Sequence, residues 1–128
     1  MYNRRNKYGA RKTLVDGIMF DSKREADRYR QLKLLLDRGE ISNLEMQVKY
    51  ELIPAQYEVT ERYGKRGQRL KDGRKLLEKP VTYIADFVYY DLPSGEVVVE
   101  DCKGMRDQKY RIKKKLMLWV HGIRIKES

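Results

Sequence analysis

Runs of apolar residues predict two neighbouring strands in the second half of the chain. Val81–Tyr90 and Glu96–Cys102 are rich in valine and tyrosine, and Leu92–Gly95 between them has the proline and glycine of a tight turn. A symmetric hairpin about this turn places Asp86 directly opposite Asp101. A bulge in the loop would shift the register by one residue and send the two acids to different faces of the sheet.

A helix is predicted over Ser22–Arg38, ended by Gly39. Ser22 and Glu25 have the spacing of a capping box. Glu25 also heads the helix face that is predicted to be buried, which continues through Tyr29, Leu32 and Leu36. Capping alone would explain Glu25, and so would a place in a functional site; the two roles are compatible.

A second helix is predicted over Asp107–Val120, ended by Gly122. Its predicted buried stripe consists of Ile112, Leu116, Trp119 and Val120. Three cations of this helix are predicted to stay exposed and to be available for contact with nucleic acid: Arg111, Lys114 and Lys115.

Shorter patterns predict the remaining strands. Met46–Ile53 alternates polar and apolar residues, as a half-buried strand does. Tyr57–Tyr63 is a further predicted strand, Leu14–Phe20 is a short strand or lead-in with a turn at Asp16-Gly17, and Ile123–Lys126 is a closing strand. The main order is therefore helix, strand, two-stranded hairpin, helix, strand.

Composition limits the class of protein. The 128 residues fit a single domain, 1–128, and the net charge of +10 favours a polyanionic partner such as nucleic acid over a merely well-solvated basic surface. One cysteine suits a reducing compartment and, with a single histidine, excludes a Cys/His zinc site. Because no apolar run approaches the roughly 20 residues that span a bilayer, we expect a cytoplasmic protein without a membrane partner.

The positive charge is concentrated in two segments besides the second helix. Met1–Thr13 is a basic arm containing Arg4 and Arg5; it either tracks phosphates or is a terminus without a role. Gly64–Lys75 is predicted to be a loop or hairpin tip, and phosphate contact is favoured for it over simple solvation. The cations of this tip are Lys65, Arg66, Arg69, Lys71, Arg74 and Lys75.

The two acids of the hairpin should repel each other. At a Cβ separation of about 5 Å and an effective dielectric of about 20, the cost is roughly 3 kcal/mol. Lys103 lies two residues after Asp101 and therefore on the same face. Two carboxylates and an amine at the end of an apolar hairpin indicate a site for a divalent cation. Glu100 should face away and would replace Asp101 only in the shifted register.

Asp86, the triplet Asp101-Cys102-Lys103 and the order of elements together resemble the PD-(D/E)xK nuclease superfamily. A closer resemblance, to a family of small phage and prophage endonucleases, is carried by NKYGARKTLVDGIMFDSKREADRY, LEMQVKYEL, TYIADFVYYD, VEDCKG and KYRIKKKLMLW. It spans most of the chain, with a basic insertion at 57–79 less informative. Ala85 stands where the superfamily name has proline.

This resemblance implies an α/β (α+β) fold with a restriction-endonuclease-like αβββαβ core, in which a mixed central sheet is flanked by two helices. It also implies an endodeoxyribonuclease that uses Mg²⁺, with Mn²⁺ as a substitute. Asp86, Asp101 and the backbone carbonyl of Cys102 would bind the ion, and Lys103 would orient the attacking water or stabilise the transition state. Glu25 would bind through water or hold a second ion.

The same resemblance implies an activity on branched recombination intermediates of a phage, like that of a Holliday-junction resolvase, in the cytoplasm of a bacterial host. Since junction resolution needs paired cuts, a homodimer is expected. Two other functions suit the basic composition. One is a non-catalytic nucleic-acid-binding protein that retains the fold, and the other is a structural protein of a ribonucleoprotein, which leaves the paired acids unexplained.

Overall fold

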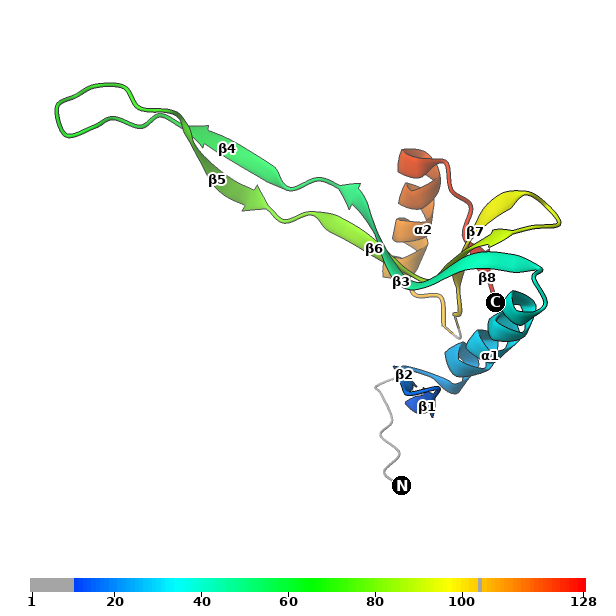
Figure 1. Cartoon of the computed structure of the whole chain (residues 1–128). Helices are drawn as coiled ribbons and strands as arrows, with labels where there is room; N and C mark the ends of the chain where they lie inside the picture. The colour runs from blue at the N-terminus through cyan, green and yellow to red at the C-terminus, as the bar shows by residue number, and fades with distance from the viewer. Residues whose placement is uncertain (1–10, 104) are drawn as a thin grey trace.

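The computed structural model describes residues 11–103 and 105–128. Figure 1 shows a body of sheet and two helices from which a long two-stranded arm projects. The elements, in chain order, are β1 (Thr13–Val15), β2 (Ile18–Phe20), α1 (Lys23–Asp37), β3 (Ile41–Ile53), β4 (Gln56–Thr60), β5 (Gly73–Glu78), β6 (Val81–Asp91), β7 (Glu96–Asp101), α2 (Gln108–His121) and β8 (Lys126–Glu127). In this part of the chain, no helix is long and apolar enough to cross a membrane.

The central sheet has the strand order β3-β6-β7-β8. Its first two pairings are antiparallel and the pairing of β7 with β8 is parallel, so the sheet is mixed. The two helices lie on opposite sides of the sheet (Figure 1), each over its own group of buried side chains. The predicted α+β class, the mixed central sheet and the αβββαβ order are confirmed.

The hairpin of β6 and β7 has the predicted register. Val88 pairs with Val99 and Phe87 with Glu100. The pairing of β6 with β7 ends at Phe87–Glu100, and Asp86 and Asp101 are the next two residues in this register. The four-residue connection is closed by the Gly95 N–H, which donates to the Asp91 carbonyl at 2.8 Å. The alternative register, which would have separated the acids, is therefore wrong.

Helix α1 forms where the sequence predicts it. The Ser22 hydroxyl accepts a hydrogen bond from the Glu25 N–H at 3.1 Å, and Gly39 ends the helix with φ +72°. Ala26, Tyr29 and Leu32 are buried against the sheet, in the group that includes Phe87 and Tyr89. The helix orientation is thus fixed by its apolar face, and Glu25 is carried toward the sheet with it.

The insertion forms the arm. β4 and β5 pair antiparallel from Gln56–Glu78 to Thr60–Gly73, and Figure 1 shows them extending away from the body. Gly64–Lys75, predicted to be a loop or hairpin tip, belongs to a hairpin, but its predicted end was wrong because β5 begins at Gly73. The two leucines of this segment are adjacent, so it lacks the alternation of apolar and polar residues that predicts a strand. Its pairing with β4 decides its conformation.

Smaller corrections concern the two ends of the described chain. Leu14–Phe20 is two strands, joined at Asp16-Gly17, where both residues have positive φ as a type I′ turn requires. The closing strand is β8 rather than Ile123–Lys126, because Lys126 and Glu127 are the residues that pair with β7. The basic arm 1–13 lies almost wholly outside the described residues.

The predicted buried stripe of α2 was wrong at three of its four residues; the fourth, Leu116, packs against the core. Trp119 is 85% exposed, Ile112 50% and Val120 46%, whereas Tyr110 and Met117 are the buried residues of this helix. Apolar residues occur on two sides of α2, and periodicity alone did not distinguish them. The Tyr110 side was selected because its hydroxyl contacts Glu127 and its ring faces Lys103.

Candidate functional site

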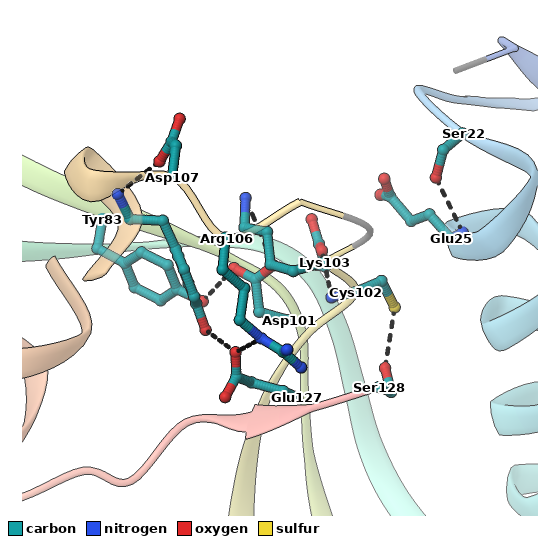
Figure 2. A network of polar contacts seen from close by, with 12 residues as sticks. Ser22, Glu25, Tyr83, Asp101, Cys102, Lys103, Arg106, Asp107, Glu127 and Ser128 are labelled. Atoms are coloured by element: carbon teal, nitrogen blue, oxygen red, sulfur yellow. Dashed lines mark hydrogen bonds and ion pairs between the residues drawn. The ribbon is translucent and has the colours of Figure 1, made fainter. Parts of the chain in front are cut away.

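Three carboxylates and a lysine from different elements meet at one end of the central sheet. Glu25 comes from the first turn of α1, Asp86 from β6 and Asp101 from the last position of β7. The Lys103 ammonium lies 3.6 Å from Asp101 Oδ1. Figure 2 shows Glu25 approaching from α1 on one side of Cys102 and Lys103, with Tyr83 and Glu127 on the other. The structure therefore brings together all four predicted residues.

Gln47 of β3 joins two of these acids. Its Nε2 donates to Glu25 Oε1 at 3.1 Å and lies 3.4 Å from Asp86 Oδ1. Gln47 has φ +54°, an uncommon value within a strand. The alternation of Met46–Ile53 puts Gln47 among the polar residues of a strand, which allows it to line the same face as the acids but gives little support for that position. Its pairing position, between Met46–Phe87 and Val48–Ala85, is the feature that puts it beside Asp86.

Asp86 is held against the end of β7. Its Oδ2 accepts a hydrogen bond from the Cys102 N–H at 2.8 Å. The sequence predicted that Cys102 would contribute its carbonyl; the contact observed within the protein is through its amide. This bond fixes one Asp86 oxygen and leaves Oδ1 facing Gln47.

Asp101 is almost fully buried, with 1% of its surface exposed. The Tyr83 hydroxyl donates to Oδ2 at 2.5 Å, but among the described residues Oδ1 has no hydrogen-bond partner. A buried carboxylate oxygen without a donor costs free energy. A hard cation would satisfy it, because Mg²⁺ prefers carboxylate oxygens.

The acids perturb one another. The pKa of Glu25 is raised to about 7, mainly by burial and then by the charges of Asp86, Asp21 and Asp101. The pKa of Asp86 is raised to about 6, again by burial first and by Asp101 second, while the Cys102 amide and Lys103 oppose the rise. The predicted repulsion between Asp86 and Asp101 is thus present, and it extends to Glu25.

The carboxylates of this cluster suit a magnesium ion. Within residues 11–103 and 105–128, no three His, Cys, Asp or Glu side chains are already arranged around one metal position. Mg²⁺ does not need such a cage, since it usually keeps several waters and binds through one or two carboxylates. Asp86 and Asp101 meet that requirement, with Asp101 Oδ1 as the oxygen that lacks a donor.

Glu100 faces away from this site, as predicted, and has a structural role that the sequence did not reveal. It is fully buried and accepts hydrogen bonds from Arg28 Nε at 2.5 Å, Arg28 Nη2 at 2.9 Å, the Tyr89 hydroxyl at 2.8 Å and the Ser128 hydroxyl at 2.9 Å. The Arg28–Glu100 pair ties α1 to β7. Arg28 lies three residues after Glu25, and Glu100 lies one residue before Asp101. The sequence feature that could have indicated this role is the spacing of Arg28, which lies three residues after Glu25 and therefore close to the same helix face.

An open pocket of about 270 Å³ adjoins Lys103, and its wall also includes Lys109 and Lys113 at the start of α2. The pKa of Lys113 is lowered, by burial first and then by the charges of Lys109 and Lys103. Three ammonium groups outnumber the one carboxylate of this lining, that of Asp107, and favour an anion there. Sequence reasoning did not select Lys109 or Lys113, although their i, i+4 spacing puts them on one face.

The predicted phosphate contacts differ in their surroundings. All six cations of the arm tip are exposed; among them, Arg69 pairs with Asp72 at 3.1 Å and Arg74 lies 4.3 Å from the centre of the Tyr57 ring. Arg111 and Lys115 are exposed as predicted. Lys114 is not, because it is half-buried and binds Glu127 Oε1 at 2.6 Å. Arg4 and Arg5 lie outside the described residues.

A family model matches residues 5–121, nearly the whole chain, including every element of the site. Its description is "Protein of unknown function (DUF1064)". The chain belongs to this family. No curated protein and no solved structure matches the chain.

Proposed function

We propose that this protein is a divalent-metal-dependent endonuclease that hydrolyses phosphodiester bonds in DNA. The observation that carries the proposal is the meeting of Glu25, Asp86, Asp101 and Lys103, from three elements, at one sheet end of a chain with net charge +10. This is the set that the resemblance to PD-(D/E)xK nucleases selects.

Each residue of the site has a separate role in the proposed reaction. Asp86 and Asp101 would hold the cation, with the Cys102 carbonyl beside them, and Glu25 would act through water or a second ion. When bound, Mg²⁺ supplies charge neutralisation on the phosphoryl oxygens and a Lewis acid for the attacking water and the leaving 3′-oxygen. Lys103, 3.6 Å from Asp101, orients that water or stabilises the charge that develops in the transition state. Gln47 keeps Glu25 and Asp86 in place.

The surroundings of the acids support an anionic polymer as substrate. The pocket with Lys103, Lys109 and Lys113 lies next to the carboxylates and suits a phosphate of the same strand. The exposed cations of the arm tip add a second, distant place for phosphate contact, beyond the reach of a small substrate.

The test is cleavage of supercoiled plasmid with Mg²⁺ or Mn²⁺, for the wild type and for Asp101→Asn. The substituted amide has the shape of the carboxylate and can still accept from Tyr83, so the fold should survive. We expect nicking by the wild type, none by Asp101→Asn, and none with EDTA. Asp27→Asn, an exposed acid on α1, is the matched control and should cleave like the wild type.

Absence of cleavage by the wild type, with DNA binding retained, would contradict the enzyme and favour the second candidate, a non-catalytic nucleic-acid-binding protein. From the resemblance we extend the proposal to branched recombination intermediates, cut by a homodimer in the bacterial cytoplasm. A synthetic four-way junction tests this: paired, symmetric cuts are expected, and equal cleavage of a linear duplex would contradict it.

A further inference from the structure

Helix α2 has one face on the protein and one face to solvent. The inner face contains the buried Tyr110 and Met117. It also contains Lys114, bound to Glu127, and His121, whose Nε2 lies 2.7 Å from the Glu51 carbonyl. Trp119 is two residues after Met117, which at 3.6 residues per turn puts it on the opposite side. The outer face is therefore centred on Trp119, with 85% of its surface exposed, and includes Ile112 two turns earlier.

This exposure is unusual for the residue type. Tryptophan is a large side chain that is highly buried on average, and this is the only tryptophan of the chain. Single exposed apolar residues need no explanation. Trp119 is not single, because Ile112 is exposed on the same face of the helix and Leu118 beside it is 51% exposed. A flat aromatic surface is therefore offered to a partner.

The charge of α2 indicates which partner. Its 14 residues include five lysines and arginines and no acid. Arg111 and Lys115 are exposed, and Lys115 lies one turn before Trp119. A second copy of the chain docked by this same face would bring like charges together, which costs free energy. A strand of nucleic acid brings phosphates to the cations and a base to the indole ring.

We propose that Trp119, flanked by Arg111 and Lys115, is a stacking platform for an unpaired base of single-stranded nucleic acid. Within a duplex the faces of the bases are covered by their neighbours, so the indole can stack only where bases are unpaired. The inference rests on the proposed nucleic-acid partner and narrows it to DNA that contains a single-stranded segment.

The position of α2 connects this platform to the candidate active site. The helix begins beside the carboxylates, where the Tyr110 ring centre is 5.0 Å from the Lys103 ammonium. Trp119 is nine residues further on, about 14 Å along the helix axis. Because Trp119 and Tyr110 lie on opposite sides of a helix about 10 Å wide, the whole span is about 17 Å, or about five steps of a nucleic-acid strand at ~3.4 Å per step. One strand could therefore lie with a phosphate near Lys103 and an unpaired base on Trp119.

The experiment uses the indole as its own reporter, in Asp101→Asn protein with EDTA so that no cleavage intervenes. A thymidine oligonucleotide of about 16 nucleotides is titrated while tryptophan fluorescence is recorded, and its affinity is measured separately by anisotropy of a labelled copy. We expect strong quenching of Trp119. Trp119→Ala should weaken single-strand binding by about 5- to 150-fold, the range found when one stacking aromatic is removed.

Matched measurements separate stacking from general loss of contact. Trp119→Phe should restore most of the affinity, and Leu118→Ala, which removes a neighbouring exposed apolar group, should change it less than twofold. Affinity for a blunt duplex should be the same for the wild type and Trp119→Ala. Thermal unfolding of Trp119→Ala should match the wild type, because the side chain is exposed.

Two results would overturn the inference. Unchanged fluorescence, or equal single-strand affinity of the wild type and Trp119→Ala, would exclude stacking, while duplex binding and cleavage would leave the proposed nuclease intact. A dimer in sedimentation that dissociates on Trp119→Ala would assign the surface to a second copy instead. Failure to bind any nucleic acid would refute both proposals.

Discussion

Lys103 is held in the candidate site by two neighbours. Its ammonium lies 3.6 Å from Asp101 Oδ1 and 5.0 Å from the centre of the Tyr110 ring. A carboxylate and the face of an aromatic ring both attract a cation and hold the ammonium group in one place. Lys103 is therefore positioned to stabilise negative charge or to orient water.

We expect Lys103→Met to reduce the rate of DNA cleavage by about 10²- to 10³-fold, the loss found when a single group that stabilises transition-state charge is removed. DNA affinity in EDTA should change less than threefold, since many other cations of this protein would share the contacts with the proposed substrate. Single-turnover cleavage at saturating protein measures the first quantity and anisotropy the second. Lys49→Met, an exposed lysine on β3, serves as control. A wild-type rate for Lys103→Met would remove this residue from the mechanism.

The residues of the site were predictable to different degrees. Asp86 and Asp101 could be paired because the turn and the alternation of the hairpin fix the register. Gln47 could not be placed with the same certainty, because β3 is longer than its clearest pattern and has register shifts. Glu100 was predicted to face away, but its contact with Arg28 depends on the packing of α1, which the local sequence does not encode.

Among the elements, α1 is tied to β7 by one buried ion pair, in addition to the packing of its apolar face on the sheet. Arg28 and Glu100 make two hydrogen bonds, and Glu100 is fully buried. The pKa of Glu100 is lowered: burial opposes this, and the hydrogen bonds from Arg28 and Tyr89 outweigh it. The carboxylate is therefore charged inside the protein and needs its partner.

We expect Arg28→Met to lower the free energy of unfolding by about 3–5 kcal/mol, because it leaves a buried charge without compensation. Urea denaturation measures this change. Arg30→Met is the control: its pair with Asp27 is exposed and should be worth about 0–1 kcal/mol. Removing both charges, with Arg28→Met and Glu100→Leu together, should recover part of the loss. If Arg28→Met and Arg30→Met lose equal stability, the pair does not hold α1.

The arm of β4 and β5 is an element whose contribution can be measured separately from the active site. Replacing Lys65 and Arg66 by glutamine should reduce the slope of log affinity against log salt by about 2, if each contacts one phosphate at ~0.9 per contact. Duplex binding measured over a range of salt concentrations tests this. The charge-matched control is the replacement of Arg30 on α1 and Arg38 directly after it, both exposed. An unchanged slope for the arm variant would show that the tip lies away from DNA.

Elements were predictable where local signals agreed. Serine, glutamate and glycine fixed the ends of α1, and proline and glycine fixed the hairpin turn. α2 was found with nearly correct ends, but its buried face was not, because apolar residues lie on two of its sides. Contacts with Glu127 and Lys103, which come from other segments, decide between them.

For the whole molecule, the carboxylate cluster links the fold's stability to pH. The pKa values of Glu25 and Asp86, about 7 and about 6, lie above their ordinary values of 4.5 and 3.8. The metal-free folded protein therefore holds these protons more tightly than the unfolded chain. This contribution to stability is complete below about pH 4 and is lost as the pH rises to about 7, at up to about 1.4 kcal/mol per pH unit for each group.

Asp86→Asn isolates this effect. The variant removes one repelling charge and can still accept from the Cys102 amide, so in EDTA it should gain stability over the wild type as the pH rises from about 4 to about 7. Asp27→Asn, exposed on the same helix as Glu25, should show no such trend. Thermal unfolding across this pH range measures the difference. A constant difference would mean that neither burial nor the neighbouring acids raise the pKa of Asp86 in solution.

Mg²⁺ should offset this loss of stability at neutral pH, since one cation bound to the acids of β6 and β7 would relieve their repulsion. At 100 times its dissociation constant a ligand of the folded state adds about 2.7 kcal/mol. We expect this gain near neutral pH and a much smaller one at about pH 4, where protons compete for the same oxygens. Asp86→Asn and Asp101→Asn should lose the Mg²⁺ effect, whereas Asp27→Asn should keep it. Equal stabilisation of all four proteins would show that the ion binds elsewhere.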